Sequence, residues 1–140
     1  MSGITTAGIS AGGTLAFGGA LPAARIGGGW VVGYSNGTAG TTIGRAALTA
    51  PANIVSTTGT VLLLSTSPTA AITANAGVQL LTPNIAAQMD RKMDDGQPES
   101  GFAQAYGVQN SCFGAAVGGP YAYQELVTSK DCGILFRIQG

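Results

Sequence analysis

The sequence predicts an α+β domain of short strands, one helix and long loops, and three observations lead to this prediction. The chain has 140 residues, which is the size of a single domain. Glycine accounts for 23 of them, against a usual share of about 7%, and this favours tight turns over long regular elements. One stretch, residues 82–95, carries the start signal, apolar spacing and stop signal of a helix. Residues 1–140 are therefore interpreted as one domain.

The first half of the chain contains the earliest strand candidates. Residues 1–29 are rich in glycine, alanine and threonine, and their glycine pairs predict an irregular segment. Trp-Val-Val-Gly-Tyr at 30–34 predicts a strand, and Asn-Gly at 36–37 favours a hairpin turn after it. Two apolar runs, 54–55 and 61–64, flank a Thr-Thr-Gly-Thr segment and predict a second hairpin.

The helix over 82–95 has recognisable ends. Thr82 can accept a hydrogen bond from an early helical N–H, and Pro83 suits the first helical position. Gly96 suits the left-handed conformation that ends many helices. Apolar residues that recur every four positions are expected to form one buried stripe: Ile85, Met89 and Met93. The sequence thus predicts both the limits of this helix and the face that it buries.

Three further segments complete the expected strands. Residues 102–106 alternate between apolar and small or polar types, as a half-buried strand does. Residues 121–127 fit a strand or a turn. The segment at 134–138 reads Ile-Leu-Phe-Arg-Ile and predicts a strand with Ile134, Phe136 and Ile138 on one face. These segments indicate a sheet made of elements far apart along the chain.

Cys112 and Cys132 are the two cysteines of the chain. A disulfide is the favoured interpretation, and it would stabilise the fold by about 3 kcal/mol in the loop-entropy model. Two free buried thiols are the alternative. A catalytic thiol is the least favoured reading, because the chain has no histidine to activate one. A disulfide would place the protein outside the reducing cytosol.

Composition excludes several classes of function. Six basic and six acidic side chains give a formal charge of zero, so the chain lacks the basic footprint of a nucleic-acid binder. The absence of histidine removes histidine-based catalysis and histidine metal sites, and two Gly-x-Ser-x-Gly motifs therefore have no base to serve them. Polar residues interrupt every apolar run, so no membrane-spanning segment is expected. We do not expect an enzyme.

One acidic cluster is a candidate metal site, formed by Asp90, Asp94, Asp95 and Glu99. Calcium is the metal that such carboxylates suit. The spacing of an EF-hand loop fails, because Lys92 stands where an oxygen ligand belongs. A solvated helix end is the favoured interpretation, with a calcium site as the alternative and no other cofactor expected.

The second half of the chain shows an ordered set of motifs. Leu-Thr-Pro at 81–83 leads into Met-Asp-Arg-Lys-Met-Asp-Asp-Gly-Gln-Pro-Glu-Ser-Gly at 89–101. Then come Cys112, a tyrosine, Cys132 and the aliphatic segment at 134–138. This order resembles prepilin-type proteins of Gram-negative bacteria, namely type IV pilins and type II secretion pseudopilins. The glycine-aromatic stretch at 27–34 is also similar, so the resemblance covers about residues 27–140.

The resemblance implies a fold, a location and partners. It implies a small antiparallel sheet packed on a helix, with a disulfide that closes residues 112–132 into the family's D-region. It implies a subunit of a cell-surface or periplasm-spanning filament, whose partners are other pilin or pseudopilin subunits and the assembly machinery. The family's leader and long apolar N-terminal helix are missing, so we expect a portion of a membrane-anchored parent protein. The sheet is expected to expose an apolar strip where that helix would lie.

Two other functions stay open. One is a minor pilin or adhesin that binds a ligand, for which the available aromatic contacts are Trp30, Tyr34, Tyr106, Tyr121 and Tyr123. An exposed aromatic cluster beside the disulfide would favour it, and separately buried rings would favour the filament subunit. The other is a phage or virus fibre or capsid domain, with which free thiols would be compatible.

Overall fold

We analysed a computed structural model of the chain. It describes residues 16–19, 21–36, 42–43, 46–47, 58–68, 77, 79–115 and 120–138. Three predicted features lie wholly or largely outside the described residues. They are the irregular segment at 1–29, the strand at 54–55 and the turn residue Gly37. The elements are β1 (Gly29–Asn36), β2 (Thr42–Ile43), β3 (Ala46–Ala47), β4 (Thr58–Ser65), α1 (Pro83–Met93), β5 (Ala103–Gly107), β6 (Phe113–Ala115), β7 (Tyr121–Tyr123) and β8 (Cys132–Arg137).

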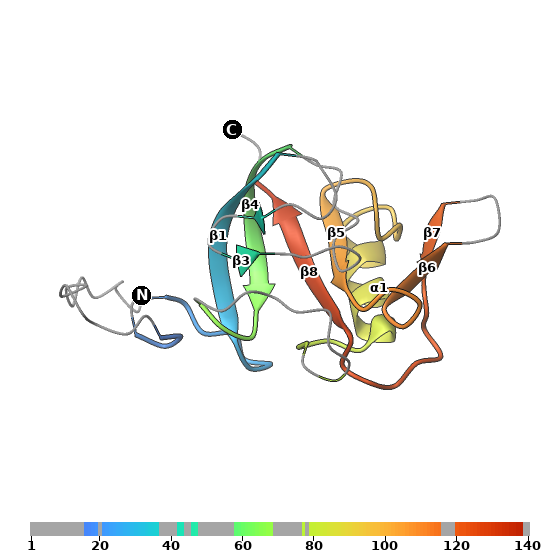
Figure 1. Cartoon of the computed structure of the whole chain (residues 1–140), viewed down its shortest axis with the longest axis horizontal. Coiled ribbons are helices and arrows are strands. Elements are labelled where there is room, and N and C mark those ends of the chain that lie inside the picture. Colours follow the sequence, from blue (N-terminus) through green and yellow to red (C-terminus); the bar gives the residue numbers. More distant parts are fainter. Residues whose placement is uncertain are drawn as a thin grey trace.

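The main sheet has four antiparallel strands in the order β1-β4-β8-β5. Helix α1 lies near the β5 edge, and the short hairpin of β6 and β7 lies beyond it (Figure 1). β2 and β3 form a separate small pair. The α+β class is therefore confirmed, together with a mostly antiparallel sheet, one helix and one disulfide among the described residues.

Small side chains decide how closely α1 approaches the sheet. The helix turns Ala86 and Ala87 inward, and strand β5 meets it with Ala103 and Ala105. All four are fully buried and pack with Ile134 of β8. Because alanine adds little bulk, the helix and strand backbones come close and leave little space between them.

This packing overturns the predicted burial of the helix. The expected buried stripe is wrong, because Ile85 is 47% exposed and Met93 is 54% exposed. Met89 is only partly buried. Met89 and Met93 instead line a groove beside α1, and Ile85 is exposed. Periodicity identified an apolar face correctly but could not tell that the alanines would face the sheet.

The opposite face of the sheet is also buried, with Tyr106 at its centre. Tyr106 is 1% exposed, and its hydroxyl donates a hydrogen bond to the carbonyl of Leu64. Its cross-strand partner is Gly133. A Cβ added at Gly133 would lie 2.0 Å from the Tyr106 ring, so only glycine fits there. Burial on both faces explains why β8 is apolar nearly throughout.

Candidate functional site

Helix α1 has two flanks of different character, and together they form the candidate site. Thr82 caps its start by accepting a hydrogen bond from the N–H of Ile85 at 3.4 Å, and Pro83 occupies the first turn. The helix ends at Met93, and Gly96 adopts a φ of 74° in the turn that follows. These capping residues play the roles that the sequence predicted.

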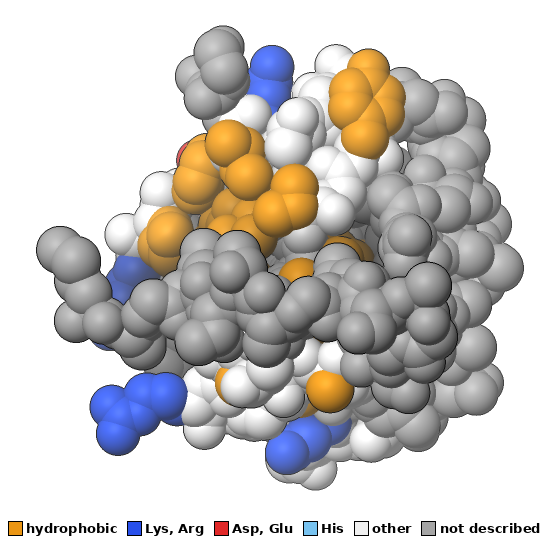
Figure 2. Space-filling view, turned by 90° about the vertical axis from the view of Figure 1, so that its left-hand side faces the viewer, with side chains coloured by type: hydrophobic (Ala, Val, Ile, Leu, Met, Phe, Trp, Pro, Cys, Tyr) orange, Lys and Arg blue, Asp and Glu red, His pale blue; other side chains and the backbone are white. Residues whose placement is uncertain are grey.

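The first flank borders a groove of about 490 Å³ that we call the apolar groove. Its lining residues are Trp30, Leu62, Met89, Met93, Phe102, Phe136, Arg137 and Ile138. Seen from the β1 side of the molecule, the largest group of hydrophobic side chains forms a patch at the upper left, and smaller groups lie apart from it (Figure 2). Arg137 is the only charged residue in this lining, so the groove is suited to an apolar partner.

The register of the sheet explains the floor of the groove. Trp30 pairs with Leu64, and Val32 pairs with Leu62, which in turn pairs with Phe136. These residues share one face of the sheet because partners across a ladder point the same way. Leu64 and Phe136 belong to the core under α1, whereas Val32 is 63% exposed. The helix thus covers one half of this face and leaves the β1 half accessible.

Aromatic rings form the floor of the groove, and methionines form one wall. Phe136 stands between Trp30 and Phe102, with ring centroids 5.8 and 5.6 Å apart. Met89 and Met93 form the wall on the helix side. Methionine is flexible and polarisable, and it adapts to partners of varied shape. The groove therefore combines a fixed aromatic floor with an adaptable side.

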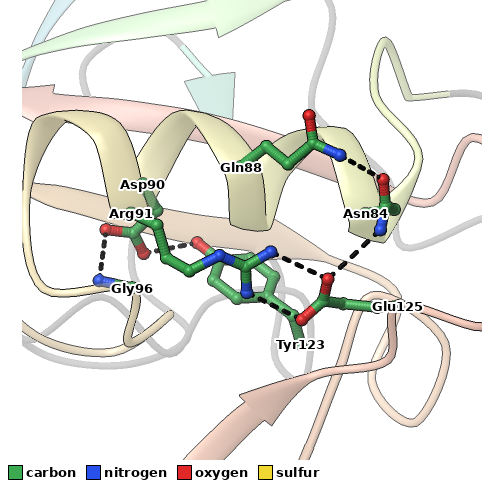
Figure 3. Close-up of polar contacts among 7 residues, drawn as sticks. All are labelled: Asn84, Gln88, Asp90, Arg91, Gly96, Tyr123 and Glu125. Atoms are coloured by element: carbon green, nitrogen blue, oxygen red, sulfur yellow. Dashed lines mark hydrogen bonds and ion pairs between the residues drawn. The ribbon is translucent and has the colours of Figure 1, made fainter.

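The second flank is closed by polar contacts, which we call the helix–loop junction (Figure 3). Arg91 donates two hydrogen bonds to the Glu125 carboxylate, at 2.8 and 2.9 Å. Asn84 donates to the same carboxylate at 3.2 Å, and Gln88 donates to Asn84 at 2.7 Å. The hydrogen bonds from Arg91 lower the pKa of Glu125 and raise that of Arg91. This exposed network fixes the turn that follows β7.

Asp90 lies under that network and is fully buried. One carboxylate oxygen accepts a hydrogen bond from the Tyr123 hydroxyl at 2.8 Å, and the other accepts one from the N–H of Gly96 at 3.1 Å. Burial raises the pKa of Asp90 to about 6, against the effect of these two donors. Asp95 and Asp94 raise it further. Burial, followed by the charge of Asp90, raises the pKa of Tyr123.

The two following aspartates fold the turn between α1 and β5. Asp94 accepts hydrogen bonds from the N–H of Ala103 at 2.9 Å and from that of Phe102. Asp95 accepts from the N–H of Gln97 at 2.8 Å and from the Ser100 hydroxyl at 2.7 Å. Both aspartates therefore satisfy hydrogen-bond donors of this turn.

The calcium alternative can be compared with this geometry. Asp90, Asp94 and Asp95 each place one carboxylate oxygen within 4.8 Å of the others. Glu99 is outside that group and accepts a hydrogen bond from the N–H of Tyr121 instead. The interpretation as a solvated helix end is wrong for Asp90, which is buried. Hydrogen bonds account for all three clustered carboxylates, so the arrangement assigns no metal ligand, and calcium stays a prediction.

The predicted disulfide joins Cys112 to Cys132, with Cα atoms 5.0 Å apart. Both cysteines are fully buried and neither is free, so the alternatives of free or catalytic thiols are wrong. Cys132 also exchanges two backbone hydrogen bonds of 3.0 Å with Leu81, just before the helix. The disulfide thereby ties the loop of residues 112–132, the start of β8 and the approach to α1 together.

Asp131, next to the disulfide, is a buried carboxylate that the sequence did not single out. It accepts hydrogen bonds from the hydroxyls of Ser111 and Ser129 and, at 2.6 Å, from the N–H of Gly77. Burial would raise the pKa of Asp131, but these three donors outweigh it and lower the pKa. Asp131 thus holds the end of the 112–132 loop that lies at the disulfide, whereas Asp90 contacts Tyr123 within this loop. Ser129 is close to Asp131 in the sequence, but Ser111 and Gly77 are distant from it, and Asp90 is distant from Tyr123, so no local pattern predicts these contacts.

Among the described residues, the aromatic residues named as ligand contacts form no exposed cluster beside the disulfide. Tyr106 and Tyr123 are buried, and Tyr121 packs edge-on against Phe113 at 5.7 Å. Tyr34 is 62% exposed on β1, and Trp30 lies in the apolar groove. Tyr123 lies with Cys112 and Cys132 in the buried core, Tyr121 packs against that core, and the exposed Tyr34 belongs to β1.

Comparisons with known proteins give no identification. No protein-family model, curated protein or solved structure matches the chain. Within the described ranges, no helix has the length and apolar character required to cross a membrane. Function must therefore be inferred from the residues and their geometry.

Proposed function

We propose that the chain is a structural subunit domain of a type IV pilus or type II secretion pseudopilus filament. It acts by assembly and surface display and carries out no catalysis. The observation that carries this proposal is the apolar groove, one wall of which is formed by Met89 and Met93 of α1. The motif order from Leu81 to Cys132 supports it through its resemblance to prepilin-type proteins.

The groove favours a helix as its occupant. It runs between a helix and the uncovered half of a sheet, a setting in which apolar helices pack. Exposed continuous apolar surface on a small domain usually marks a contact with another protein segment. In the proposed assembly, an apolar helix of the parent protein fills the groove, and neighbouring subunits and the assembly machinery are the partners.

The polar sites support a structural role. The three clustered aspartates satisfy donors of their own turn, and Asp131 satisfies three donors beside the disulfide. The chain supplies no histidine as a general base. The disulfide fits a periplasmic or extracellular location, where such bonds persist. We place the domain in a cell-surface filament, with its parent anchored in the membrane before assembly.

The alternatives have less support. Burial of Tyr106 and Tyr123 does not favour a minor pilin or adhesin that binds ligand through an exposed aromatic cluster. A phage or virus fibre or capsid domain is compatible with free thiols, whereas both cysteines here are bonded. Neither alternative explains the open apolar flank of α1 as directly as a helix-binding subunit does.

The proposed function can be tested with a helical probe. A synthetic 20-residue leucine-alanine helix in detergent micelles would be titrated into protein carrying ¹³C-methyl methionine. We expect the signals of Met89 and Met93 to shift on addition of the peptide and to remain unchanged in micelles alone. Met93→Lys should abolish the shift of Met89, because it places a charge in the groove wall.

A matched substitution distinguishes binding in the groove from non-specific binding of the peptide elsewhere. Leu126 is 98% exposed and is not part of the groove lining, so Leu126→Lys adds the same charge elsewhere. This variant should bind the peptide as the unmodified protein does. Failure of the peptide to shift either methionine, or equal loss of binding in both variants, would contradict the proposal.

A further inference from the structure

We propose that Met93 is an oxidation site, and that conversion of its thioether to the sulfoxide by hydrogen peroxide prevents an apolar helix from occupying the apolar groove. This inference rests on the proposed function, because it concerns the same groove and the same kind of occupant. It starts from two observations: methionines form one wall of the groove, and Met93 is 54% exposed. Oxidation of a sulfur atom is faster the more accessible that atom is to solvent.

The methionine thioethers are the sulfur atoms that peroxide can oxidise readily. Cys112 and Cys132, the two cysteines of the chain, are bonded to each other and fully buried, so no free thiol competes for the oxidant. Met89 is partly buried and packs against the core, whereas Met93 lies one turn further along α1 and is more exposed. Met93 is therefore expected to react first. A third methionine, Met1, lies outside the described residues.

The oxidation balances with hydrogen peroxide as its one co-reactant. The sulfur lone pair of Met93 attacks a peroxide oxygen, so that a sulfur–oxygen bond forms and the oxygen–oxygen bond breaks. The sulfur loses two electrons, and the displaced hydroxide takes up the remaining proton and leaves as water. The product is a polar sulfoxide, which persists until a methionine sulfoxide reductase removes the oxygen.

The added oxygen changes which occupant the groove accepts. Apart from Arg137 and the methionines, the lining residues are apolar or aromatic: Trp30, Leu62, Phe102, Phe136 and Ile138. An apolar helix that covers Met93 would remove the sulfoxide oxygen from water and offer it no donor, because helical N–H groups bond within the helix. Burial of an unpaired polar group should weaken binding by about tenfold or more. Oxidation thus favours the unbound domain, whereas an occupant that binds first shields the thioether.

The first experiment measures which methionine reacts. Unmodified protein would be treated with dilute hydrogen peroxide, quenched with catalase, reduced and digested with trypsin, which separates Met89 from Met93 by cleaving after Arg91 and Lys92. Each sulfoxide adds about 16 Da to its peptide. We expect Met93 to oxidise several-fold faster than Met89, and the leucine-alanine helix in micelles to slow its oxidation. A rate for Met89 that equals or exceeds that of Met93 overturns the inference.

The second experiment measures binding. Trp30 is the single tryptophan of the chain and lines the groove, so its fluorescence reports binding of the leucine-alanine helix, with micelles alone as the blank. Protein oxidised at Met93 should bind the helix at least about tenfold more weakly than untreated protein, with an unchanged midpoint of denaturant unfolding. Binding that survives complete oxidation of Met93, or a loss of binding that accompanies unfolding, overturns the inference.

Two variants assign the effect to one sulfur atom, and each is compared with itself before and after peroxide. Met93→Leu should lose little of its own binding, because the exposed thioether is gone. Adding Leu126→Met to this variant moves the thioether to a position that is 98% exposed and outside the groove lining. The double variant should oxidise readily at residue 126 and keep its binding. If it loses as much binding as the unmodified protein does, the inference is wrong.

The outcomes also distinguish failure of the oxidation site from failure of the proposed function. Untreated protein that does not bind the helix contradicts the filament proposal and removes the basis of the oxidation site with it. Untreated protein that binds, together with protein oxidised at Met93 that binds equally well, contradicts the oxidation site alone and leaves the filament proposal in place.

Discussion

The two flanks of α1 differ in how they are covered: hydrogen bonds to a loop close one, and an apolar groove borders the other. On one flank, Asn84 and Arg91 donate hydrogen bonds to Glu125 and close the helix against the disulfide loop, and Gln88 donates to Asn84. On the other, Met89 and Met93 line the apolar groove, and Met93 is exposed. The closed flank carries polar side chains at the surface, as is usual, whereas the open flank leaves apolar side chains accessible to water.

The difference shows which flank of α1 finds its contacts within the chain and which flank has apolar groups left for a partner. Polar groups at the closed flank find their partners within the chain, so that flank serves internal stability. Apolar groups at the open flank gain free energy only when a further segment removes them from water. Substitutions on the closed flank should therefore act on folding, and those on the open flank should act on binding.

The largest expected effect is at the disulfide that supports the closed flank. Replacing both cysteines, Cys112→Ser with Cys132→Ser, should lower the free energy of unfolding by about 3 kcal/mol because the unfolded chain regains loop entropy. Denaturant unfolding of oxidised protein checks this value. Unmodified protein in reductant should approach the variant, and an unchanged midpoint in both would contradict the role assigned to the disulfide.

The next effect is at the buried hydrogen bond of the closed flank. Tyr123→Phe leaves Asp90 with the N–H of Gly96 as its one remaining donor, which should cost about 1–3 kcal/mol at pH 7. The loss should be smaller at pH 4.5, where a protonated Asp90 needs less compensation. Unfolding measured at both pH values tests this, and an equal loss at each would show that packing of the ring is what matters.

On the open flank, Met93→Lys should change the free energy of unfolding by less than about 0.5 kcal/mol, as is usual for an exposed position. The same substitution should nevertheless remove binding of an apolar helix. Measuring unfolding and peptide binding on one preparation separates the two effects. A large loss of stability with retained binding would reverse our assignment of the flanks.

The smallest effect is expected at the surface ion pair. Arg91→Ala removes both hydrogen bonds to Glu125, but the pair is exposed to solvent and its Coulomb energy is screened. Thermal unfolding in low salt should show a slight decrease in Tm that disappears in 1 M salt. A decrease that persists in high salt would mean that Arg91 contributes through packing rather than charge.

Local rules predicted much of the fold. Thr82 and Pro83 start the helix, and Gly96 takes the positive φ that was expected of it. The segments at 30–34 and 61–64 fall within β1 and β4, and those at 102–106 and 134–138 largely coincide with β5 and β8. These predictions worked because capping, turn formation and strand alternation depend on residues close together in the chain.

The sequence by itself determined the lack of a histidine catalyst, predicted the main strands and the helix with its cap at Thr82, and favoured a disulfide between its two cysteines. Only the tertiary structure decided which flank of α1 is buried, that Tyr123 satisfies Asp90, and that Trp30, Phe102 and Phe136 meet in one groove. The alanines of α1 and β5 fit each other more closely than the larger apolar residues could, and this match appears only when the two elements pack. Such choices depend on contacts between distant segments, and no local pattern encodes them.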